Sequence, residues 1–305
     1  MMPLVSIITI TYNRGTLIHR CIESIQHQTY SNYEHIIVDG NSDDNTEDVV
    51  LSYHDPHIKF IKLDTRGPQL QMRAGADVAR GDYVTFLDDD DEYLPTKIQK
   101  QVALFESLSN DYGLVYCWMT YFNYSNPDYP IKIHQTELRG FVGDIAVSKE
   151  LVCGTPTLMI RRSVFEEFGG SYDDTHGVIG SDWELASRIC HRYSVDYVPE
   201  SLVKVYVNHG FGRLSETSLN REYLTNQIRF HLHFLDEFKE VFERHPEFSA
   251  IHLQMISKNN MMLGNWKEGF KYYWQLIRYR LDFKTCALIP YVIILKLKMQ
   301  WTSKY

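Results

Sequence analysis

The segment Tyr83-Val-Thr-Phe-Leu-Asp-Asp-Asp-Asp-Glu, residues 83–92, is the strongest signal for both fold and function. Its first five residues are apolar, aromatic or β-branched, as in a buried strand, and five acids follow directly. Adjacent carboxylates repel one another by about 1 kcal/mol per pair even in water, and a divalent cation would relieve this. Mg²⁺ and Mn²⁺ suit such a strand end, because they take oxygen ligands from acids and phosphates. The alternative is that Asp91 and Glu92 only begin the next helix, near Pro95.

Short β-branched runs alternate with helical patterns on both sides of this segment, which predicts a βαβ series. Such a series forms an α/β fold, a sheet with parallel strands, helices on both faces and ligands at the carboxyl ends of the strands. Residues 115–149 are rich in aromatic and turn-forming residues, and we expect irregular structure there. The expected strands are 5–10, 35–38, 58–61, 83–87, 158–160 and 202–207, and the expected helices are 17–28, 47–53, 69–79, 96–108, 163–168 and 182–191.

The composition of the 305 residues excludes several classes of protein. The apolar fraction of 44% is that of a globular chain, and the net charge of −8 disfavours a nucleic-acid binder, which needs a basic surface. Five scattered cysteines without a CxxC pair indicate a reducing, cytoplasmic setting. We expect no signal peptide and no transmembrane helix, since Cys286 to Trp301 is interrupted by Pro290 and two lysines.

The character of the sequence changes after Ser218, where long amphipathic helices replace strand formers. We therefore predict a catalytic domain at 1–218 and a helical region at 219–305. Residues 258–305 contain nine Lys or Arg and two acids, a net charge of +7, so residues 1–257 carry −15. This asymmetry, together with many aromatic residues, predicts peripheral contact with an anionic membrane, at the inner face of the plasma membrane. The alternative is a helical cap with its lysines in solvent.

Two other strands are followed by polar residues. Asp39 and Gly40 come directly after the strand at 35–38, although an Asp-Gly pair is also ordinary turn chemistry. The first strand leads into Thr9, Thr11, Tyr12, Asn13 and Arg14. Three strand ends of a parallel sheet meet at one edge, so these residues and the acids at 88–92 are predicted to line one crevice.

The order of these motifs resembles the family 2 glycosyltransferases, which are inverting enzymes of the GT-A fold. The resemblance covers about residues 4–215 and rests on short segments in a fixed order. These are Val5-Ser-Ile-Ile-Thr-Ile-Thr-Tyr-Asn, Ser24-Ile-Gln-His-Gln-Thr-Tyr, Glu34-His-Ile-Ile-Val-Asp-Gly-Asn-Ser-Asp, and Gly81-Asp-Tyr-Val-Thr-Phe-Leu-Asp-Asp-Asp-Asp.

The resemblance implies a GT-A type Rossmann-like mixed sheet and assigns roles to single residues. Tyr12 and Asp39 would contact the nucleotide base, Asp88 the ribose or the metal, and Asp90 the metal that bridges the diphosphate. Four aspartates in a row leave the register open, with Asp89 and Asp91 as alternatives. His209 would be a third metal or diphosphate contact, with a surface-loop histidine as the alternative. Further donor contacts would come from Thr9, Thr11, Asn13, Arg73 and Asp89, with Arg80 and Arg213 as secondary candidates; the family commonly has Asn at the position of Arg73.

Asp182 stands where the family has its catalytic base, an acid followed by an aromatic residue at the start of a helix. Inversion by a single displacement needs one carboxylate to take the proton of the acceptor hydroxyl, which agrees with this assignment. Glu184 is the rival, but two positions along a helix turn a side chain by roughly 200°, so both cannot face one point. The alternative is an ordinary acid at a helix N-terminus.

The predicted function is metal-dependent, inverting transfer of a sugar in cell-surface polysaccharide synthesis. The donor would be a UDP-sugar and the acceptor a hydroxyl of a glycan or lipid-linked saccharide, with Mn²⁺ or Mg²⁺ as cofactor. The alternative is a nucleotidyltransferase, which would need a phosphate-binding loop rich in glycine and lysine after its first strand. Residues 9–16 contain one glycine, Gly15, and no lysine, which argues against it. A non-enzymatic phosphoacceptor module would be much shorter and would leave residues 157–182 without a role.

Overall fold

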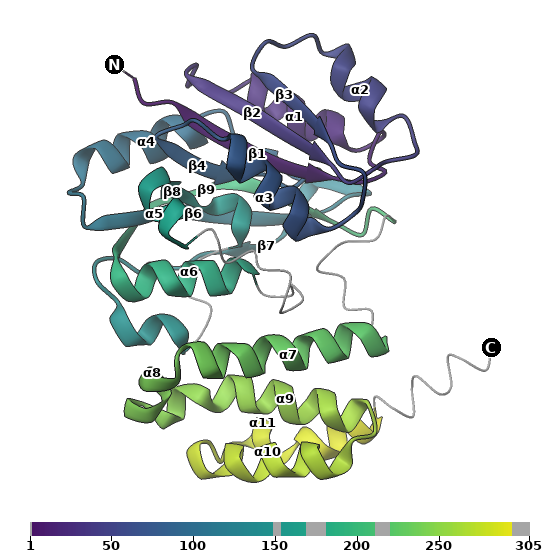
Figure 1. The fold of residues 1–305 in the computed structure, drawn as a ribbon, viewed down its shortest axis with the longest axis vertical. Helices are drawn as coiled ribbons and strands as arrows, with labels where there is room; N and C mark the ends of the chain where they lie inside the picture. The colour runs from purple at the N-terminus through teal and green to yellow at the C-terminus, as the bar shows by residue number, and fades with distance from the viewer. Residues whose placement is uncertain (1, 149–153, 169–180, 211–219, 295–305) are drawn as a thin grey trace. The chain divides into compact units, whose positions relative to one another are not determined.

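The computed structural model describes residues 2–148, 154–168, 181–210 and 220–294. It divides into two compact units. The first comprises Met1–Ala146, Glu150–Asp174 and Ser181–Phe211, and the second comprises Val147–Lys149, Thr175–Gly180 and Gly212–Tyr305. Figure 1 shows strands and helices in the first unit, and helices in the described part of the second.

The first unit contains a nine-stranded mixed sheet in the order β3-β2-β1-β4-β8-β6-β9-β5, with β7 paired to β6. Strands β1, β2, β3 and β4 are parallel to one another, whereas β8 runs antiparallel to β4. The strands are β1 (Val5–Thr11), β2 (Tyr33–Asp39), β3 (Ile58–Lys62), β4 (Tyr83–Phe86), β5 (Glu92–Tyr93), β6 (Tyr112–Asn123), β7 (Asn126–His134), β8 (Met159–Arg161) and β9 (Ser194–Val207).

Helices cover both faces of this sheet, as predicted, because side chains alternate along each strand. On one face Ile7 packs with Cys21 of α1 and Phe105 of α4. On the other face Ile8 belongs to a cluster with residues of α5 and α6, against which α3 also packs. The helices of this unit are α1 (Ile18–Gln26), α2 (Thr46–Ser52), α3 (Pro68–Val78), α4 (Lys97–Ser107), α5 (Arg162–Phe168) and α6 (Ser181–Arg192).

The region expected to be irregular, 115–149, forms strands in its first part, β6 and β7, whereas its described residues 135–148 contain only an isolated bridge at Gly140 and a short 3₁₀ helix, Gly143–Val147. β6 pairs with β7, β8 and β9, and its aromatic residues Tyr116 and Trp118 stack on Tyr197 of β9. Only residues 124 and 125 connect β6 to β7, and Pro127 and Pro130 lie within β7, which tolerates them because it lies outside the main strand order. The prediction was wrong for 115–134, where the turn-forming residues of a hairpin and its outer strand were interpreted as a loop.

The second unit is described from α7 onward and packs around its own apolar core. Leu224, Leu253 and Leu276 come from three different helices and are buried together. No helix in the described part of the chain is both long and apolar enough to cross a membrane. Its helices are α7 (Arg221–Glu237), α8 (Lys239–Arg244), α9 (Ala250–Met262), α10 (Trp266–Tyr279) and α11 (Phe283–Cys286).

The register of the sheet brings three strand ends to one edge. Thr11 is opposite Asp39, and Ile8 is opposite Phe86, so β1, β2 and β4 end close together. The side chain of Gln71 on α3 fixes this edge by donating to the carbonyl oxygens of Thr11 at 2.8 Å and Val38 at 3.0 Å. The edge is therefore a rigid platform for the loops that follow the strands.

A fully buried lysine lies under this platform. Lys97 of α4 donates to the Thr85 hydroxyl at 2.6 Å, and its ammonium lies 3.9 Å from the centre of the Tyr93 ring. Burial lowers the pKa of Lys97 to about 7, because the charged form loses its hydration. The lysine is therefore a source of pH-dependent stability.

We expect the free energy of unfolding to rise with pH between about 7 and 10.5, by up to about 1.4 kcal/mol per unit from Lys97. In this range the unfolded chain keeps a proton that the folded chain has lost, and below it the folded state carries the full cost of a buried charge. Lys97→Met should remove this slope, whereas Lys100→Met, at an exposed lysine, should keep it. Denaturant melts of the three proteins across this range measure the effect; an unchanged slope in Lys97→Met would contradict it.

Candidate active site

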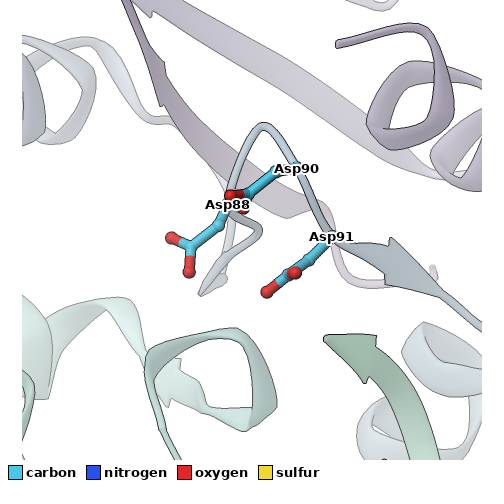
Figure 2. A group of neighbouring side chains, drawn as sticks. All are labelled: Asp88, Asp90 and Asp91. Carbon is cyan, nitrogen blue, oxygen red and sulfur yellow. The ribbon is translucent and has the colours of Figure 1, made fainter. Parts of the chain in front are cut away.

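The acidic segment forms a turn between β4 and β5. The backbone N–H of Asp91 donates to the carbonyl oxygen of Asp88 at 3.1 Å, which closes the turn. Figure 2 shows the side chains of Asp88, Asp90 and Asp91 projecting from it, and one carboxylate oxygen of each lies within 4.8 Å of the others. Asp90 and Asp91 are buried. Three close carboxylates, two of them buried, supply the hard oxygen ligands that Mg²⁺ and Mn²⁺ prefer.

The end of β9 holds two of these acids in place. The backbone N–H of Tyr206 donates to Asp91 Oδ1 at 3.0 Å, and His209 Nε2 lies 2.8 Å from Asp90 Oδ2. The His209 side chain is only 1% exposed, so this is not the surface-loop histidine of the alternative interpretation. The structure thus places Asp88 and Asp90, two of the three predicted metal ligands, in one group with Asp91, and it places the third, His209, in contact with Asp90.

Glu92 has a separate, structural role. It lies in β5, where Tyr206 donates a hydrogen bond to it at 2.8 Å and Lys204 pairs with it at 3.0 Å. The next helix begins only at Lys97. The interpretation that Asp91 and Glu92 merely begin this helix is therefore wrong.

Asp89 points away from the metal group and toward the exit of β1. Its carboxylate lies 3.6 Å from the guanidinium of Arg14. Burial first, and then the neighbouring Asp90, raise the pKa of Asp89 to about 7, although Arg14 and the Thr11 hydroxyl act in the opposite direction. Asp89 is thus placed between the acidic turn and the first strand rather than among the three clustered carboxylates.

Asp39 and Asn13 tie together the loops after β2 and β1. Asp39 is fully buried and accepts hydrogen bonds from the backbone N–H of Ser42 at 2.8 Å and from its hydroxyl. The Ser42 oxygen accepts from the backbone N–H of Asn13 at 2.8 Å, and Asn13 Oδ1 accepts from that of Asp43 at 3.0 Å. Asn13 has a φ of 53°, a left-handed conformation that Asn tolerates well. Asn13 directly follows Tyr12 in the sequence, so these bonds fix the backbone next to Tyr12.

Tyr12 stacks against a residue that the sequence analysis did not select. The guanidinium carbon of Arg66 lies 4.3 Å from the centre of the Tyr12 ring, and Arg66 itself is exposed. Arg66 belongs to the loop between β3 and α3, and a loop residue has no periodic pattern that would reveal it. Arg73, a predicted donor contact, lies on α3 and is exposed.

The two predicted threonines of β1 lie inside the domain. Thr9 is fully buried and its hydroxyl pairs with His35 Nε2 at 3.0 Å. Burial lowers the pKa of His35 to about 3, so this histidine is neutral. Thr11, two residues further, is at the strand end beside Asp89. Thr11 therefore lies at the edge of the sheet where the strands end, whereas Thr9 lies inside the domain and away from this edge.

The predicted base lies at the start of α6. The backbone places Asp182 in the first turn of this helix, while its side chain is outside the described residues. The rival acid, Glu184, is paired with Arg188 at 2.6 Å one turn along the same helix, and both side chains are mostly buried. This ion pair occupies Glu184. The assignment of the base to Asp182 stays a prediction.

Of the two secondary candidates, only Arg80 belongs to the described residues. Arg213 lies outside the described residues. Arg80 lies before the amino end of β4, and its backbone N–H donates to Glu34 at 2.7 Å, at the start of β2. The expectation that Arg80 could reach a phosphate is wrong, because parallel strands put their amino ends on the side opposite the acidic turn.

The sequence matches the family model described as glycosyl transferase family 2 at residues 6–169. An uncharacterized glycosyltransferase of Rickettsia typhi is 30% identical over 229 residues, which are 72% of this chain and 68% of the relative. The GalNAc(5)-diNAcBac-PP-undecaprenol beta-1,3-glucosyltransferase of Campylobacter jejuni is 43% identical over 97 residues, 30% of this chain and 31% of the relative. WfaP of Escherichia coli, a UDP-Glc:alpha-D-GlcNAc-diphosphoundecaprenol beta-1,3-glucosyltransferase, is 38% identical over 107 residues, 35% and 43% of the two chains. The match thus spans less than half of the last two relatives.

Solved structures show the same fold. TarS of S. aureus, in complex with UDP-GlcNAc, superposes with a TM-score of 0.68 at 16% identity and covers 93% of this chain and 83% of its own. The mannosyltransferase PcManGT of Pyrobaculum calidifontis, in complex with GDP-Man and Mn²⁺, gives 0.55 at 18% identity and covers 99% and 84%. The predicted GT-A type sheet with C-terminal helices is confirmed.

Proposed function

The chain belongs to glycosyl transferase family 2 and is a glycosyltransferase, and we propose that it transfers a sugar with inversion from a UDP-sugar, in a reaction that depends on Mn²⁺ or Mg²⁺. The observation that carries this proposal is the turn after β4, where Asp88, Asp90 and Asp91 converge beside the ends of β1 and β2. A glycosyl donor with a diphosphate needs its negative charge balanced at such a place.

The residues of the turn fit a divalent ion. All ligands are hard oxygens except the imidazole of His209, which is 2.8 Å from Asp90. Asp88, Asp90 and Asp91 would hold the ion, with His209 as a further ligand or as the partner that orients Asp90. When bound, the ion would neutralise the negative charge of the departing diphosphate.

Inversion follows from the roles of the chain's own residues. The Asp182 carboxylate would take the proton of the acceptor hydroxyl while the hydroxyl oxygen forms its bond to the anomeric carbon. The bond from that carbon to the diphosphate oxygen breaks in the same step, and the diphosphate leaves with the electron pair. Tyr12, with the Arg66 guanidinium over its ring, and Asp39, at the end of β2, would hold the base of the nucleotide.

The relatives support a uridine donor and a lipid-linked acceptor. The printed name of WfaP specifies UDP-Glc and a diphosphoundecaprenol acceptor, and that of the Campylobacter enzyme specifies a PP-undecaprenol acceptor. A putative colanic acid biosynthesis glycosyl transferase of Escherichia coli, WcaA, is 28% identical over 79% of this chain. We therefore place the enzyme in cell-surface polysaccharide synthesis, at the inner face of the plasma membrane, with 1–218 as the catalytic domain.

A panel of nucleotide sugars tests this function. Without an acceptor, water can take the place of the acceptor hydroxyl, so the purified protein should hydrolyse one or a few UDP-sugars slowly. This hydrolysis should occur only when Mn²⁺ or Mg²⁺ is present. The anomeric configuration of the released sugar, followed by NMR, should be opposite to that of the donor. Hydrolysis of no nucleotide sugar, or retention of configuration, would overturn the proposal.

A further inference from the structure

The outward face of α10 carries an unusual set of exposed side chains. Trp274 is 60% exposed and Phe270 is 37% exposed, and Lys267, Lys271 and Arg278 of the same helix are also exposed. A largely exposed tryptophan leaves a large apolar surface in water, which is unfavourable unless a partner covers it. We refer to these five residues as the α10 stripe.

Helical geometry puts the α10 stripe on one side of the helix. At about 100° per residue, its five members fall within a sector of roughly 100°, and Glu268, the one acid of α10, lies outside this sector. The buried residues Gly269 and Leu276 lie on the opposite side. The Glu268 carboxylate nevertheless reaches Lys271, with which it pairs at 3.2 Å. The α10 stripe therefore combines two aromatic rings with three cationic side chains, one of which is paired with this acid.

Packing against α9 fixes which side of α10 faces outward. A Cβ atom added to Gly269 would lie 2.5 Å from Cγ of Met261, so only glycine permits the close approach of the two helices. The hydroxyl of Ser257 donates to the carbonyl oxygen of Gly269 at 2.9 Å across the same contact. The helix cannot rotate to bury Trp274 without losing this contact, and the α10 stripe stays exposed within its unit.

The charge of the chain favours an anionic surface as the partner. Residues 258–305 carry +7, whereas the preceding 257 residues carry −15. An anionic bilayer would repel most of the protein and attract this region, so contact through the α10 stripe is favoured electrostatically. Trp and Phe side chains prefer the boundary between headgroups and acyl chains, while the lysine and arginine side chains reach the headgroups.

We propose that the α10 stripe is a docking surface for anionic phospholipid bilayers. The helix lies parallel to the membrane, with Trp274 and Phe270 inserted at the headgroup boundary and the three cations against lipid phosphates. This deepens the proposed function, because a lipid-linked acceptor is presented at a membrane surface. Membrane docking nevertheless needs neither donor nor acceptor, so it is tested separately from catalysis.

Co-sedimentation of the full chain with vesicles tests the docking surface. We expect binding to vesicles that contain phosphatidylglycerol, little binding to pure phosphatidylcholine, and weakening with added salt. Removing the three charges (K267Q, K271Q and R278Q) should lower the partition coefficient by roughly fivefold per charge, on the order of a hundredfold together. Trp274→Ala should lower it by about tenfold through lost apolar burial.

A matched control removes three positive charges from other exposed positions of the same unit, Arg221, Arg229 and Lys239. This R221Q, R229Q and K239Q variant should bind vesicles nearly as well as the unchanged protein, and thermal melts check that all variants fold. Equal loss in both triple variants, or binding that is indifferent to the α10 stripe, would overturn the docking surface. Metal-dependent hydrolysis of UDP-sugars, measured without vesicles, should be the same in all variants as in the wild-type protein. If the wild-type protein showed no such hydrolysis, that result would count against the proposed function and not against the docking surface.

Discussion

Replacing Asp182 by Asn is expected to reduce sugar transfer by ~10² to 10⁴-fold while the affinities for UDP and metal stay nearly unchanged. The amide keeps the shape of the carboxylate but cannot take the proton of the acceptor hydroxyl. Asn also caps a helix N-terminus about as well as Asp, so a purely structural role in the first turn of α6 would survive the substitution. Single-turnover transfer, UDP titration and thermal melts on the same variant separate catalysis, binding and folding.

Glu184→Gln is the matched control on the same helix. Glu184 is paired with Arg188 and lies roughly 200° around the helix from Asp182, so most transfer activity should remain. If Glu184→Gln lost transfer activity while Asp182→Asn kept it, Glu184 would be the catalytic base. Full transfer activity in both variants would leave Asp182 with a structural role only, and loss of UDP binding in Asp182→Asn would place its charge in the donor site.

Asp90→Asn is expected to abolish metal-dependent binding of the donor nucleotide. Loss of a residue that only orients a metal ligand costs 10 to 100-fold in affinity, and loss of a ligand should cost at least as much. Asp90 also contacts His209 at 2.8 Å, so the substitution weakens both parts of the group. Calorimetric titration of UDP with Mn²⁺ present measures the loss.

Asp91→Asn should be milder, because an Asn oxygen can still accept the hydrogen bond from the Tyr206 backbone. The comparison also decides the register of the four aspartates, since Asp88, Asp90 and Asp91 all belong to the group. If Asp91→Asn lowered the affinity for UDP with Mn²⁺ more than Asp90→Asn did, Asp91 would be the main metal ligand in place of Asp90.

The parallel half of the sheet was predictable because its signals are local. Strands β1, β2 and β4 are apolar runs followed by polar residues, and parallel strands end at the same edge whatever the details of packing. That Asp39 and the acidic turn share this edge therefore followed from the parallel pattern, whereas their closeness depends on β1 lying between β2 and β4. The contact of His209 with Asp90 joins residues far apart in the sequence, and it was proposed from the resemblance rather than from any spacing.

The features that were missed depend on tertiary contacts. β5 contains only Glu92 and Tyr93, too few residues for a periodic pattern, and it exists because β9 pairs with it. The stacking of Arg66 on Tyr12 depends on the path of a loop. The hairpin of β6 and β7 was hidden because the residues of a tight turn and those of an irregular loop are the same.

Calorimetric titration of UDP into the protein, with and without Mn²⁺, tests most directly whether the acidic turn holds the donor through a divalent ion. The account predicts clear binding with Mn²⁺ and weak binding without it, because Asp88, Asp90 and Asp91 would otherwise face the diphosphate with like charge. Equal affinity in the two conditions would contradict a metal role for this turn.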